Sequence, residues 1–87
     1  MARVEKEIEI KNSQGLHARP AAMFVQIAQK YDSDILIQKG DEKVNGKSIM
    51  GILMLGAYHG SKITIIAEGE DAEKAFVELE GYLSAGE

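Results

Sequence analysis

The sequence predicts an α+β domain of two layers, in which a four-stranded β-sheet is covered on one face by three helices. Some short segments alternate apolar and charged residues, which is the period of a half-buried strand. Others space their apolar residues three or four positions apart, as a helix with one buried face does. These segments follow one another in the order β-α-β-β-α-β-α, and we expect residues 1–87 to form a single domain.

The first half of the chain contains four of these elements. Residues 4–10 alternate aliphatic residues with glutamates and are predicted to form the first strand. A helix is expected from Ala18 to Tyr31, where the apolar residues have helical spacing. Asp34–Gln38 is the second strand, and Gly40-Asp41 turns the chain into a short third strand over residues 42–45.

The second half supplies the last strand and two helices. Residues 48–57 form a short apolar helix, and residues 62–67 form the fourth strand, which Gly69 ends. Asp71 is the expected cap of the last helix. The residues that this helix should bury are Ala72, Ala75, Phe76, Leu79 and Leu83.

Composition excludes several classes of function. The absence of cysteine excludes disulfides, thiolate chemistry and cysteine-based zinc sites, and we expect neither a metal nor a cofactor. A net charge of −4 argues against nucleic-acid binding, which needs a basic face. The N-terminal residues resemble neither a signal peptide nor a membrane span, so we expect a cytoplasmic monomer that does not insert into membranes. Basic residues gather in the first half, and this asymmetry suggests an acidic partner or a phosphate.

His17 in the stretch QGLHARPAA (residues 14–22) has four possible roles. It is a surface histidine, a zinc ligand, a general base, or a nucleophile that accepts a phosphoryl group. The zinc role lacks partners, since the only other histidine is His59 and its spacing does not fit. A general base needs a substrate pocket, for which a chain this short offers little room.

The neighbours of His17 favour the nucleophile. Gly15 permits a tight turn, and Pro20 is tolerated only in a first helical turn, so the helix begins close by. His17 then lies near unpaired backbone N–H groups that bind anions, and Arg19 adds a charged, forked donor. The positive end of the helix dipole and the charge of Arg19 both disfavour a protonated imidazole, so we expect a neutral, nucleophilic ring. The residue before a proline avoids helical backbone, which leaves a later helix start open at Arg19.

A second informative stretch is VNGKSIMG, residues 44–51. Ser48 is predicted to be the N-cap of the short helix, a position that also accepts a phosphate favourably. The helix is too short to bury every apolar side chain, so some of Ile49, Met50 and Leu53 should form an exposed patch that docks partners.

With both stretches, the chain resembles the HPr family of histidine-containing phosphocarriers of the bacterial phosphoenolpyruvate:sugar phosphotransferase system. The resemblance implies an open-faced β-sandwich with an antiparallel sheet in the order 1-4-2-3. It further implies that the Nδ1 atom of His17 takes phosphate from phosphorylated enzyme I and passes it to the IIA domains of sugar permeases. Arg19 would hold the phosphoryl oxygens and Pro20 would shape the first helical turn. Such a protein is a carrier rather than a turnover catalyst.

The resemblance also implies regulation at Ser48. An HPr kinase/phosphorylase would phosphorylate this serine, and the phosphoform would bind a transcription regulator of carbon catabolite repression. Ile49, Met50 and Leu53 would be the docking patch. Two alternatives stay open: a mainly regulatory HPr-like module, whose members lack the active-site histidine, and a carrier of a nitrogen-related phosphotransferase branch.

Overall fold

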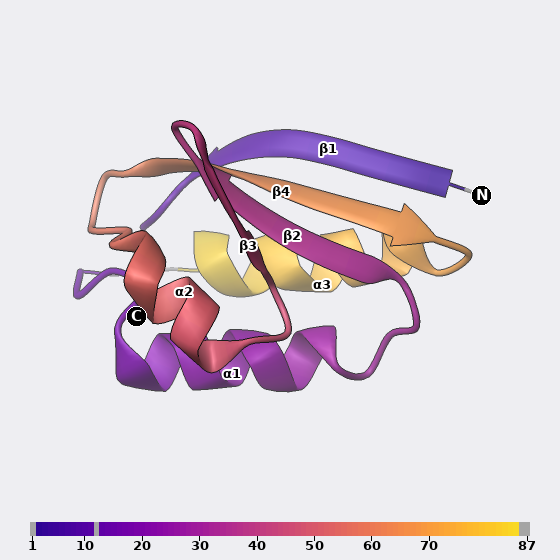
Figure 1. Ribbon diagram of the computed structural model, residues 1–87, viewed down its shortest axis with the longest axis horizontal. Helices are drawn as coiled ribbons and strands as arrows, with labels where there is room; N and C mark the ends of the chain where they lie inside the picture. The colour runs from indigo at the N-terminus through magenta and orange to yellow at the C-terminus, as the bar shows by residue number, and fades with distance from the viewer. Residues whose placement is uncertain (1, 12, 86–87) are drawn as a thin grey trace.

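A computed structural model of the protein describes residues 2–11 and 13–85 (Figure 1). Strands and helices follow one another in the predicted order. Their bounds are β1 (Ala2–Glu9), α1 (Ala18–Ala28), β2 (Asp34–Lys39), β3 (Glu42–Asn45), α2 (Ile49–Leu55), β4 (Lys62–Gly69) and α3 (Ala72–Ser84).

The four strands form one antiparallel sheet in the order β1-β4-β2-β3, which confirms the predicted topology. β4 therefore lies in the middle, between β1 and β2, although it is the last strand in the chain. The two-residue turn Gly40-Asp41 joins β2 to β3, and Gly40 has a φ of 59°, which suits glycine.

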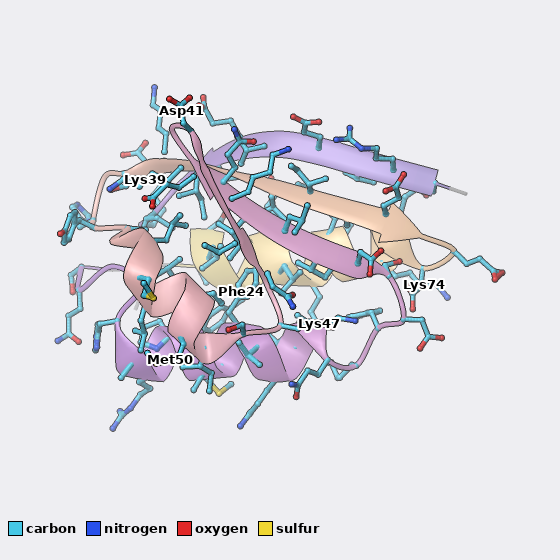
Figure 2. The ribbon with its side chains drawn as sticks, in the orientation of Figure 1. Phe24, Lys39, Asp41, Lys47, Met50 and Lys74 are labelled. Carbon is cyan, nitrogen blue, oxygen red and sulfur yellow. The ribbon has the colours of Figure 1, made fainter. Side chains whose placement is uncertain are left out.

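The helices lie on one side of the sheet, as the alternation in the strands predicted (Figure 1). α3 packs beneath β1 and β4, α2 packs against β2 and β3, and α1 contacts both other helices. Phe24 of α1 is fully buried and lies between α1 and the sheet (Figure 2). The sheet contributes a continuous apolar face made of Ile8, Ile35, Ile37, Ile63, Ile65 and Ala67. No helix within the described residues has both the length and the hydropathy that crossing a membrane requires.

α1 ends at Ala28 and not at the predicted Tyr31, because the chain tightens after this point. The N–H groups of Lys30 and Tyr31 donate to carbonyls three residues back, at 3.1 and 3.2 Å, which is the pattern of a 3₁₀ turn. The Tyr31 side chain is partly buried and packs against the core, in keeping with the apolar pattern. Its hydroxyl donates to Glu78 of α3, whose carboxylate also accepts from Lys30 at 2.6 Å. These two donors lower the pKa of Glu78.

Asp71 is the N-cap residue of α3, as predicted, and its carbonyl accepts from the Ala75 N–H at 3.0 Å, but its side chain makes no capping hydrogen bond. The carboxylate instead accepts from the N–H groups of Asp32 and Ser33, at 2.9 and 3.0 Å, and from the Ser33 hydroxyl. The turn after α1 and the turn before α3 are also in close contact. A Cβ added to Gly69, the last residue of β4, would lie only 2.4 Å from Oγ of Ser33. The turn after α1 is thereby tied to the turn before α3.

The bonds from Ser33 and Asp32 lower the pKa of Asp71, so this group should make stability depend on pH. A carboxyl whose pKa is lowered by folding stabilises the native state above its unfolded value of about 4. That stabilisation is lost as the pH falls through the folded-state pKa. Asp71→Asn should therefore lower the melting temperature at neutral pH, and its deficit against the wild type should shrink below about pH 4.

Thermal unfolding followed by circular dichroism at several pH values measures this deficit. Glu73→Gln, in the first turn of the same helix, is the matched control, because Glu73 is exposed. A deficit for Asp71→Asn that stays constant down to strongly acidic pH would show that the ionised carboxylate is not what holds the turn.

Candidate functional site

His17 is the N-cap residue of α1. Its backbone is extended, with φ −97° and ψ −162°, and its carbonyl accepts the first intrahelical bond from the Ala21 N–H at 2.8 Å. Its side chain is exposed to solvent and does not cap the helix. The prediction that His17 lies at the helix N-terminus is therefore confirmed, and the imidazole is accessible to another molecule.

The first turn of α1 leaves two backbone donors open beside His17. The N–H groups of Ala18 and Arg19 have no hydrogen-bond acceptor among the described residues, and Pro20 has no N–H. Arg19 is regularly helical despite preceding a proline, so the later helix start that the sequence left open does not occur. Its side chain is exposed and forms no ion pair within residues 2–11 and 13–85. Pro20, by contrast, is buried against the core.

The loop before His17 is fixed by close contact with the segment that follows α2. Gly15 has a φ of 71°, and a Cβ there would lie 2.6 Å from the Ala57 carbonyl oxygen and 2.8 Å from the Tyr58 Cα. The next residue, Leu16, is buried and donates its N–H to the same carbonyl at 2.9 Å. Glycine is therefore required both by the backbone conformation and by the space available.

The side chain of Gln14 contacts His17, and the sequence did not predict this contact. Its Oε1 lies 2.5 Å from Nε2 of His17, in a hydrogen bond between two exposed side chains. The only signal in the sequence is a polar residue three positions before the histidine. That signal is insufficient on its own, because the contact depends on how the turn at Gly15 folds the chain back.

Ser48 is the N-cap of α2, as predicted. Its Oγ accepts a hydrogen bond from the Gly51 N–H at 3.0 Å, and its carbonyl accepts from Ile52 at 3.1 Å. The loop that carries it is tied to the turn after α1, because the ammonium of Lys47, which is labelled in Figure 2, donates to the Tyr31 carbonyl at 2.7 Å. Ser48 itself is partly exposed.

The apolar surface of α2 extends further than the sequence indicated. Ile49 and Met50 are exposed, at 42% and 66%, and Met50 lies on α2 above α1 in Figure 2. Leu53 differs from the expectation, since it is only partly exposed and packs against the core. Met54 is 75% exposed, and the prediction did not include it. A helix of seven residues buries only one narrow face, here Ile52 and Leu55.

The structure places the two predicted sites at opposite ends of α2. The C-terminal end of α2 leads directly into Ala57 and Tyr58, which contact the Gly15 turn. Ser48 lies at the N-terminal end of α2. The seven residues of this helix separate its two ends by roughly 10 Å. The apolar patch of Ile49, Met50 and Met54 lies on the helix between them.

A family model described as "PTS HPr component phosphorylation site" matches residues 4–85, nearly the whole chain. The chain belongs to the PTS HPr family. It is a phosphocarrier of that family and, like its members, not a turnover catalyst. Its fold is the HPr fold.

Similar proteins carry two different names. The HPr-like protein Crh of Bacillus subtilis (strain 168) is 44% identical over 92% of this chain and 94% of its own length. The crystal structure of the phosphocarrier protein HPr from Bacillus anthracis str. Ames is 48% identical, with a TM-score of 0.91 over 95% of this chain and 99% of that one. A crystal structure of B. subtilis Crh, 43% identical over 94% of both chains with a TM-score of 0.78, is described as an intertwined dimer formed by domain swapping.

The contact at Gly15 should be costly to disturb. Gly15→Ala introduces both an unfavourable φ and a collision with the Ala57 carbonyl, whereas Gly40→Ala introduces only an unfavourable φ, since nothing lies within 4 Å of a Cβ there. We expect Gly15→Ala to lower the free energy of unfolding by about 1–3 kcal/mol more than Gly40→Ala. Urea unfolding of both variants measures the difference, and equal losses would mean that the close packing against Ala57 contributes nothing.

Proposed function

We propose that this protein carries a phosphoryl group on His17, which it accepts from phosphorylated enzyme I and passes to the IIA domains of sugar permeases. The observation that carries the proposal is the placement of an exposed imidazole at the N-cap of α1. Among the residues that the structure describes, the two N–H groups beside it have no acceptor and the Arg19 guanidinium has no ion pair. Residues 1–87 would act as one phosphocarrier domain in the cytoplasm.

The proposed chemistry needs only what this helix end offers. The N–H groups of Ala18 and Arg19 and the positive end of the helix dipole attract a phosphoryl group beside His17. The Arg19 guanidinium donates to its oxygens and neutralises part of its charge. Pro20 fixes the first turn, so these donors keep their geometry. Because phosphoryl transfer depends on positioning and charge stabilisation, a docked partner can share both tasks.

Ser48 is proposed as a regulatory site, phosphorylated by an HPr kinase/phosphorylase and then recognised by a catabolite-repression transcription regulator. A phosphate at a helix N-terminus is compatible with the helix, because the unpaired N–H groups there favour negative charge. The same charge lies beside Ile49 and Met50, which we propose, with Leu53, as the surface that docks partners. An acidic partner would therefore bind the phosphoform less well.

A mainly regulatory role is the second candidate, and the similarity to Crh favours it. One Crh structure is described as a catabolite repression protein, and the Ser48 site is present in this chain. His17 speaks against a purely regulatory role, because regulatory HPr-like modules are expected to lack the active-site histidine. We propose a monomer, in contrast to the swapped dimer described for one Crh structure.

Incubation with phosphoenolpyruvate and enzyme I should label the protein with acid-labile, base-stable phosphate. His17→Ala should abolish the label, because it removes the acceptor nitrogen. His59→Ala removes the other histidine and should leave labelling intact. Arg19→Ala should fold normally but accept phosphate about tenfold more slowly or worse, since one charge-assisted donor is lost.

Radiolabelled phosphoenolpyruvate followed by gel analysis and rapid-quench sampling measures these rates. Label retained on His17→Ala would move the acceptor to another residue. No label on the wild type would favour the regulatory candidate instead.

Ser48→Asp tests the electrostatic account of regulation. Aspartate is a good N-cap and should preserve the stability of α2, while its charge should slow phosphorylation of His17 by enzyme I several-fold. The effect should diminish as salt is added, because exposed charges are screened. Gln38→Glu adds the same charge on β2, outside α2, and is the matched control. If Ser48→Asp accepts phosphate at the wild-type rate even at low salt, repulsion is not the mechanism.

A further inference from the structure

The contact between Gln14 and His17 points to a role that goes beyond placing the histidine on a helix. A neutral imidazole carries its single proton on either Nδ1 or Nε2, and the hydrogen bond at one nitrogen selects the form. Oε1 of Gln14 is a pure acceptor and lies 2.5 Å from Nε2. Nε2 must therefore carry the proton, and the lone pair is left on Nδ1.

We propose that Gln14 is a positioning residue, which holds His17 in the form protonated at Nε2 so that Nδ1 is the nucleophile. The inference rests on the proposed function, for which the family resemblance implies Nδ1 as the acceptor atom, and adds which residue orients the ring. Gln14 does not touch the phosphoryl group. It acts through the imidazole, and the fixed turn at Gly15 brings it there.

The same bond should become stronger as the reaction proceeds. The Nδ1 lone pair forms a bond to phosphorus while the bond between phosphorus and the donor nitrogen breaks, and that electron pair leaves with the donor. The proton stays on Nε2, so the phosphorylated ring carries a positive charge. The carbonyl of Gln14 then accepts from a charged donor, and such bonds are roughly twice as strong as neutral ones. An interaction that strengthens during the reaction accelerates it.

The test replaces the acceptor while keeping the length of the side chain. Gln14→Met removes the acceptor, and Gln14→Glu retains an oxygen at the same place. Gln26→Met makes the same change on the exposed side of α1 and is the matched control. The ¹⁵N and ¹H correlation spectrum of the imidazole, recorded on the neutral ring of the full chain, reports which nitrogen carries the proton.

We expect Gln14→Met to shift the tautomer ratio about threefold to tenfold toward Nδ1–H, as the loss of one hydrogen bond implies. Gln14→Glu and Gln26→Met should keep the Nε2–H form. With phosphoramidate as a small donor, phosphorylation of Gln14→Met should be slower than that of the wild type. The rate should fall by at least the factor by which the Nε2–H fraction falls, while Gln14→Glu should keep the wild-type rate.

Two results would overturn the proposal: a Gln14→Met spectrum with the wild-type tautomer ratio, or wild-type phosphorylation of that variant. Either result leaves the proposed function standing as long as the wild type is labelled and His17→Ala is not. Failure of the wild type to accept phosphate from any donor would instead refute the carrier function, while the tautomer measurement would still decide whether Gln14 selects the proton position.

Discussion

The contact between the Gly15 turn and the segment after α2 is the constraint on which the candidate site depends. At Gly15 the chain passes so close to Ala57 and Tyr58 that no side chain fits, and Leu16 is bonded to the Ala57 carbonyl. His17 begins its helix directly after this contact. The backbone just before His17 is therefore fixed by packing, while the exposed imidazole itself bonds to Gln14.

The segment that Gly15 touches is itself held in place by residues of the sheet. Gly56 ends α2 in the left-handed conformation, and its carbonyl accepts a hydrogen bond from the ammonium of Lys39 at 2.7 Å. The same ammonium lies 5.0 Å from the centre of the Tyr58 ring, within the range of a cation–π contact. A residue of β2 thus stabilises the C-terminal end of α2, where the helix dipole favours a positive charge. The turn at Gly15, which leads into the candidate site, is in this way connected to the sheet through α2.

The fold was predictable from the sequence because its elements carry strong local signals, such as the alternation in β1 and the proline at the start of α1. The N-cap role of Ser48 was predictable for the same reason. The true use of Asp71 was not, because its partners Asp32 and Ser33 are nearly forty residues away along the chain. Gln14 was missed although it is close in sequence, since its contact depends on the turn that packing imposes. Local chemistry thus predicts where a helix begins, but not which polar groups the folded chain brings together.

The proline at the third position of α1 changes what the helix end can bind. A helix usually offers several unpaired N–H groups at its start, but Pro20 removes one and leaves those of Ala18 and Arg19 beside His17. Two amides do not satisfy three phosphoryl oxygens. Arg19 lies on the same turn and, within the described residues, makes no ion pair, so its guanidinium is available as the further donor. In the proposed carrier role, two amides and one exposed guanidinium would hold the phosphoryl group without enclosing it, so the group would stay accessible to the next acceptor.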